Sequence, residues 1–99
     1  MWELLNPKYK VADHVIAAHP DGTYWLMRIK SRSYMKCTGD DRRHWHYSGD
    51  CVQLDRILVP DDSAVGSPNK FRIRDSGSTF TNNTPQSVII PLESVVLEN

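Results

Sequence analysis

The sequence has few cysteines, no excess charge of either sign and no long apolar run. Cys37 and Cys51 are too few for a disulfide framework, so we expect reduced thiols and an intracellular setting, nuclear or cytoplasmic. No segment approaches the about 20 consecutive apolar residues of a membrane-spanning helix. Residues 1–7 lack the basic start and apolar core of a secretory signal, so we expect no membrane association.

Charge and size also limit the function classes. Twelve Lys and Arg residues balance twelve Asp and Glu residues, so the net charge indicates no class of partner. A chain of 99 residues fits one domain and buries roughly two-thirds of its unfolded surface, which leaves little room for a deep active-site cavity. The sequence also lacks a nucleophile elbow, a glycine-rich phosphate loop and a paired-carboxylate motif. We therefore expect no enzyme activity, no cofactor and no metal.

Helix signals are nearly absent, and short strands separated by turns explain the residue pattern better. No window shows the apolar period of an amphipathic helix, and prolines and glycines interrupt the whole chain. Residues 9–19 and 23–31 read as two strands joined by a turn at residues 19–22, where proline, aspartate and glycine are typical turn residues. On the second strand, Trp25, Met27 and Ile29 share the more apolar face, which we expect to meet the core.

The rest of the chain predicts further short strands. The expected elements are a third strand over 44–47 that ends at 48–50, a fourth apolar segment over 51–59 with a short 3₁₀ turn at 54–58, a linker-like loop over 61–69, an alternating strand over 70–75, a polar loop over 77–85, and two short strands over 87–98. Pro91 divides that last pair, because proline cannot donate to a central ladder. We expect a bend there and one strand at a sheet edge.

The first hairpin carries an ordered set of residues that points to a known kind of barrel. The matching residues are Val11-Ala12-Asp13, Val15-Ile16-Ala17, Asp21-Gly22, Tyr24-Trp25 and Ile29. This order resembles the opening hairpin of Tudor domains and of other SH3-like barrels, including chromo-barrels and tandem-Tudor subunits. Ala12 stands where that family has glycine. The resemblance implies an all-β fold, a small SH3-like or Tudor-like barrel of five to seven antiparallel strands with a C-terminal β extension.

Two registers of such a barrel fit the chain. In the first, residues 45–49 resemble the third Tudor strand and residues 52–58 close the barrel, so that residues 9–60 form the barrel and 70–99 complete or extend the sheet. In the second, residues 70–75 resemble the third strand and residues 88–92 close the barrel. The first register is preferred, because the second needs a long insertion within a small domain.

The resemblance implies a binding module for a protein or peptide tail, such as one that carries methylated lysine or arginine. The physical basis is an aromatic cage, in which ring faces attract a weakly hydrated cation. Trp25 and Tyr47 fall where cage rings are expected, and His19 and Asp50 stand at two further cage positions. Tyr24, Tyr34 and Trp45 could substitute for missing rings. Packing is the competing role of these aromatics, above all for Trp25, which shares a face with Met27 and Ile29.

Nucleic-acid binding is the main alternative. Cations alternate with aromatics between residues 28 and 47, and such a segment would contact phosphates and stack on bases. The cations are Arg28, Lys30, Arg32, Lys36, Arg42 and Arg43. The sequence pI of about 6.9 is low for a dedicated nucleic-acid domain. A small viral or phage inhibitor of a host complex is a further alternative, although no motif supports it.

Two other features bear on metal binding and assembly. Cys37, His44, His46 and Cys51 are residue types that zinc prefers, but their spacing lacks the short ligand pairs of common zinc fingers. The apolar segment over residues 87–98 could pair with a second chain if it forms an edge strand. We expect a monomer, or a homodimer formed through that edge.

Overall fold

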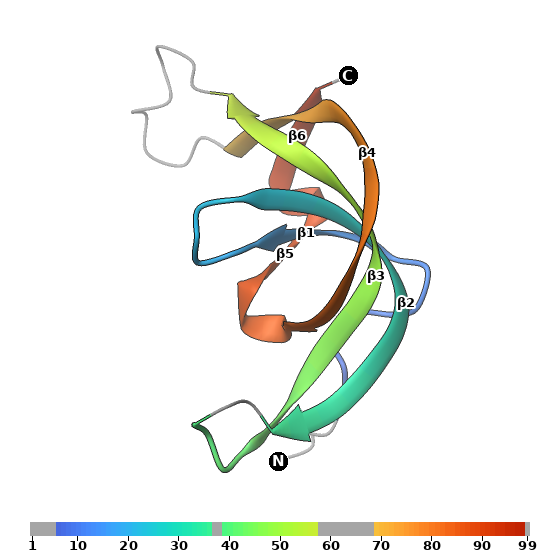
Figure 1. Cartoon of the computed structure of the whole chain (residues 1–99), viewed down its shortest axis with the longest axis vertical. Coiled ribbons are helices and arrows are strands. Elements are labelled where there is room, and N and C mark those ends of the chain that lie inside the picture. The colour runs from blue at the N-terminus through green and yellow to red at the C-terminus, as the bar shows by residue number, and fades with distance from the viewer. Residues whose placement is uncertain (1–5, 37–38, 58–68, 99) are drawn as a thin grey trace.

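The computed structural model describes residues 6–36, 39–57 and 69–98, apart from the side chain of Ser76. These residues form six strands in one sheet of order β5-β1-β2-β3-β4-β6, with two short 3₁₀ turns and no α-helix. The sheet curls into a nearly closed small barrel, which confirms the predicted all-β barrel class. Figure 1 shows β2 (Tyr24–Lys36) and β3 (Arg43–Ile57) as long curved strands around the shorter strands of the barrel.

The first hairpin forms around the predicted turn, but its first strand is shorter than expected. β1 (His14–Ala18) pairs antiparallel with β2, and the turn closes where the His19 amide donates to the Thr23 carbonyl at 2.9 Å. Residues 9–13 do not extend the strand. The Asp13 amide instead donates to the Lys10 carbonyl at 3.1 Å, and Ala12 has a φ of 79°, which is incompatible with extended backbone.

β2 and β3 continue well past their predicted ends, so the expected strand end at residues 48–50 is wrong. Gly49 allows the two strands to approach closely, because a Cβ there would lie 1.9 Å from the Arg28 carbonyl oxygen. The glycine therefore lies within the sheet and does not end β3. A bulge at Lys30 interrupts the register between Ile29 and Ser31 and shifts which residues of β2 share a face.

β4 (Asn69–Pro85) contradicts the polar loop predicted over residues 77–85. Within that segment Ser78–Thr81, Thr84 and Pro85 pair with β3, and most of its side chains are exposed. Polar residues are compatible with such a strand because its outward positions stay in water. The linker-like loop predicted over residues 61–69 lies outside the described residues, except that Asn69 begins β4.

The C-terminal segment closes the barrel, so the preferred first register is wrong on this point. Residues 52–57, where that register placed the closing strand and a 3₁₀ turn, continue β3. After η1 (Gln86–Val88), β5 (Ile89–Pro91) pairs with β1, as the second register predicted. η2 (Leu92–Ser94) then leads to β6 (Val95–Glu98), which runs parallel to the start of β4 and pairs with it. The predicted two strands around a bend at Pro91 are confirmed.

Two apolar cores lie on opposite faces of the curled sheet. The first core is built from Tyr9, Val15, Ala17, Met27, Ile29, Tyr47, Cys51 and Ile89. The second core is built from Ile16, Leu54 and Phe71, with half-buried residues of the C-terminal segment packed against them. The predicted core role of Met27 and Ile29 is confirmed, since they are 0% and 1% exposed.

Candidate functional site

The predicted cage rings do not converge on one ligand. Tyr47 is fully buried in the first core, with its ring edge against Tyr9 at a centroid distance of 5.6 Å. Tyr24 and Trp25 are neighbours on a strand and therefore point to opposite faces. Tyr24 packs on Phe71 beside the second core, whereas Trp25 packs against the first core and donates from Nε1 to Thr23 Oγ1 at 3.1 Å. These contacts are packing contacts.

The two expected rim residues are also separated. His19 lies in the β1–β2 turn. Asp50 lies in the middle of β3 and forms an ion pair with Lys30 at 2.7 Å. Since Asp50 pairs with Arg28 across the strands and Cys51 faces the first core, Asp50 points away from that core. A cage built from Trp25, Tyr47, His19 and Asp50 is therefore not present.

The cations of the predicted nucleic-acid segment are split over two faces. The bulge at Lys30 places Arg28 on the face opposite Arg32 and Lys36. Arg32 Nη1 donates to the Tyr9 carbonyl at 2.9 Å, which ties it to the N-terminal segment. Arg42 lies beside Asp40, with Nε 3.6 Å from the carboxylate. Residues 31–36 of β2 and 43–48 of β3, beyond the bulge, form the β2–β3 arm. Lys36 and Arg43 are cross-strand neighbours at the end of this arm.

An open cleft of about 570 Å³ lies between the β2–β3 arm and the connection from β4 to β5. Tyr34 and Trp45 contribute its aromatic wall, and Pro85 contributes an apolar surface from the end of β4. Tyr34 and Trp45 are cross-strand partners whose ring centroids lie 5.2 Å apart. We call this hollow the Trp45 cleft; of the predicted ligand-binding residues, it contains Trp45.

Trp45 is placed between the first core and the cleft. Its ring packs against the core, and its buried Nε1 has no hydrogen-bond partner among the described residues. An unsatisfied buried donor costs about 1–3 kcal/mol.

A chain of hydrogen bonds anchors the N-terminal segment beside the cleft. The Tyr47 hydroxyl donates to Gln86 Oε1 at 2.6 Å and accepts from the Tyr9 amide at 3.2 Å. Gln86 Oε1 also accepts from the Lys8 amide at 3.2 Å. Burial raises the pKa of the Tyr47 hydroxyl, so this group remains protonated and can donate. The buried tyrosine thereby positions Lys8, which lines the cleft.

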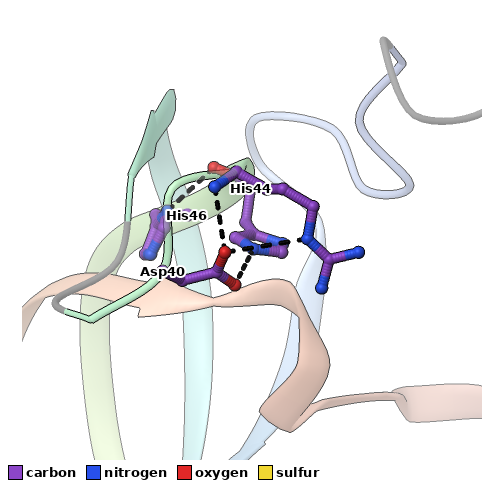
Figure 2. Close-up of polar contacts among 4 residues, drawn as sticks. Asp40, His44 and His46 are labelled. Atoms are coloured by element: carbon purple, nitrogen blue, oxygen red, sulfur yellow. Dashed lines mark hydrogen bonds and ion pairs between the residues drawn. The ribbon is translucent and has the colours of Figure 1, made fainter.

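Asp40 and His44 form a polar pair at the rim. Figure 2 shows the Asp40 carboxylate turned toward the His44 ring, whose Nε2 lies 2.8 Å from Oδ2. The Arg42 amide donates to Asp40 Oδ1 at 2.9 Å. These hydrogen bonds, the Arg42 amide first and the His44 ring second, lower the pKa of Asp40 and keep it ionised. His46 Nδ1 lies 2.9 Å from the His44 carbonyl oxygen, so Nδ1 carries the proton in that bond.

The arrangement of cysteines and histidines does not support the zinc alternative among the described residues. Cys51 faces the first core, and burial raises the pKa of its thiol. His44 and His46 lie on the other face of β3, because they alternate with Trp45 and Tyr47. Cys37 lies outside the described residues. No group of three His, Cys, Asp or Glu side chains in the described part of the chain is placed to hold a metal ion.

Sequence reasoning missed Lys8, Pro85 and Gln86 as residues of the site. Gln86 lies 78 positions from Lys8, and only the closure of the barrel brings them together. Tyr34 could be found from the sequence as an aromatic two positions from Arg32 and Lys36 within the basic segment. No local signal marks Gln86, since its role depends on the buried Tyr47 hydroxyl.

Comparisons with known proteins give no match to any family model, curated protein or solved structure. Among the described residues, no helix has the length and apolar character needed to cross a membrane.

Proposed function

We propose that the chain is a non-catalytic binding domain that holds an extended protein segment in the Trp45 cleft. The observation that carries this proposal is the half-buried pair of Tyr34 and Trp45 in the wall of an open cleft. Aromatic side chains with one face on the core and one toward solvent are typical anchors of peptide grooves. Pro85, on the facing strand end, adds apolar surface to the cleft.

The fold supports this proposal in a second way. The cleft belongs to a rigid frame, because strands β2 and β3 carry the aromatic pair and the hydrogen bonds of Tyr47 and Gln86 anchor the opposite side. A preformed groove loses little conformational entropy when a segment binds. The proposal does not include the methyl-lysine cage, since Tyr47 is 0% exposed and cannot contact a ligand.

The test is selection of short peptides on the purified protein from a display library, followed by fluorescence anisotropy on the selected peptides. Tyr34→Ala should weaken binding by about tenfold or more, which corresponds to ~1.4 kcal/mol. Phe80→Ala is the matched control, because Phe80 is an aromatic residue of β4 that is 56% exposed and lies outside the cleft lining. The proposal fails if no peptide is selected, or if both variants bind the selected peptides as the original chain does.

A further inference from the structure

We infer that the protein segment taken up by the Trp45 cleft is acidic, and that Lys8 and Arg43 bind its carboxylate beside the aromatic pair. This inference depends on the proposed function, since it names the ligand chemistry of the same cleft. It comes from the charges of the cleft lining. Lys8 and Arg43 both line the cleft, and neither forms an ion pair with a carboxylate in the described part of the chain.

Asp40 is the single carboxylate among the described residues of the lining, and its charge is already offset. Asp40 accepts from the Arg42 amide, lies near the Arg42 guanidinium and pairs with His44. Its negative charge is therefore offset locally, and the two remaining cations give the cleft a positive potential. A cleft with low-dielectric walls focuses such a potential toward its opening. The opening therefore favours an anionic group over a cationic one.

Lys8 is anchored at the edge of the cleft through its backbone, because its amide donates to Gln86 Oε1 at 3.2 Å. Its ammonium lies over the Tyr9 ring, 5.6 Å from the centroid, on the border between this cleft and a neighbouring one. Lys8 also borders a smaller cleft of about 390 Å³ that contains Asp13 and Glu93. Neither of these carboxylates forms an ion pair with Lys8 among the described residues, so the ammonium remains available to a ligand.

The observations favour an acidic protein segment over a nucleic acid. A nucleic-acid strand repeats a negative charge at each nucleotide and binds best along a continuous row of cations. In this chain the bulge at Lys30 divides the cations between two faces, and Lys30 and Arg42 are already beside carboxylates. The cleft offers two cations beside one apolar surface. That spacing fits one or two acidic side chains next to an apolar residue.

The test uses the same peptide library, read by sequence. Glutamate and aspartate should be enriched next to apolar residues, and replacing those acids by their amides in a selected peptide should weaken binding. Arg43→Gln should weaken binding of the acidic peptide by about fivefold, the upper range for a partly exposed ion pair. Arg28→Gln, which removes the same charge from the opposite face, should leave it unchanged. A chain with both Lys8→Glu and Arg43→Glu should prefer the lysine form of the same peptide.

Each failure has a separate meaning. Selected peptides that depend on Tyr34 but show no acidic bias would overturn this inference and leave the proposed function standing. A fluorescent single-stranded oligothymidylate that binds more tightly than the acidic peptide, and loses affinity with Arg43→Gln, would overturn it in favour of nucleic acid. The absence of any peptide that depends on Tyr34 would overturn both proposals. Thermal melts of each variant confirm that the change in binding does not come from unfolding.

Discussion

The Tyr47 hydroxyl and the Gln86 side-chain oxygen lie 2.6 Å apart, and this hydrogen bond joins β3 to the connection that closes the barrel. Gln86 Oε1 also accepts from Lys8, and the Tyr47 hydroxyl also accepts from Tyr9. Tyr47, which the sequence suggests as a ligand-binding ring, therefore has a structural role. Its hydroxyl holds Gln86 at the wall of the cleft, and Tyr47 itself does not line the cleft.

Tyr47→Phe should lower the free energy of unfolding by about 1–3 kcal/mol, because it leaves the Tyr9 amide without its buried partner. Urea denaturation followed by tryptophan fluorescence measures this loss. Tyr34→Phe is the matched control, since Tyr34 is a half-buried residue of the cleft lining whose hydroxyl makes no hydrogen bond among the described residues, and its removal should change stability by less than about 0.5 kcal/mol. Equal stabilities for the two variants would contradict the role assigned to the Tyr47 hydroxyl.

Gly49→Ala should destabilise the protein strongly, by more than about 3 kcal/mol, because the added methyl group would overlap the backbone of Arg28. Gly22→Ala provides a comparison in the β1–β2 turn. A methyl group there meets open space, but the φ of +91° is unfavourable for alanine and should cost about 1 kcal/mol. Thermal or urea unfolding measures both changes. A Gly49 variant as stable as the Gly22 variant would show that the two strands separate easily at this point.

The Asp40 carboxyl should titrate below its usual range, because the hydrogen bonds from the Arg42 amide and then from the His44 ring lower its pKa. The sign of the pH effect follows from this direction. The contribution of these bonds to stability is present above the unfolded-state pKa and is lost as the pH falls through the lower pKa of the folded state. Carbon-13 NMR of the carboxyl group measures the titration. His44→Ala should move the pKa of Asp40 back toward its usual value, and no movement would contradict the pairing.

The Cys51 thiol should react slowly with a thiol reagent in the folded protein, because it is buried and burial raises its pKa. Reaction with Ellman's reagent in a Cys37→Ser background isolates this thiol. The same protein in concentrated urea is the control, and its thiol should react completely before the thiol of the folded protein has reacted measurably. Rapid reaction of the folded protein would show that the first core opens readily around Cys51.

The sequence was sufficient to predict the class of fold and the first hairpin, because local signals determine both. The residues of the β1–β2 turn and the alternation of Trp25, Met27 and Ile29 are each readable within a few positions. Strand lengths were less accessible. Gly49 reads as a strand end in isolation, yet its lack of a side chain serves a close contact with Arg28 that only the paired structure reveals.

The site was harder to predict than the fold, because its residues come from distant segments. The bulge at Lys30 changes which side chains of the basic segment share a face. No glycine or proline near Lys30 indicates this bulge in the sequence. Tyr47 was suggested by its position in a family pattern, but its burial depends on Tyr9 and Ile89, which lie in other parts of the chain. The presence of an aromatic residue indicates a role in packing or in binding, but it does not show which side of the ring faces water.

The hydrogen bond from Lys8 to Gln86 joins two sides of the cleft that are synthesised far apart in time. A ribosome makes Lys8 long before Gln86, so the early strands can pair while the cleft still lacks one side. Contacts between such distant residues form late, because the intervening loop must first be closed. The cleft is therefore complete only after residues 85–89 have joined the sheet, and a nascent chain that lacks β5 would present its aromatic pair without the opposite wall.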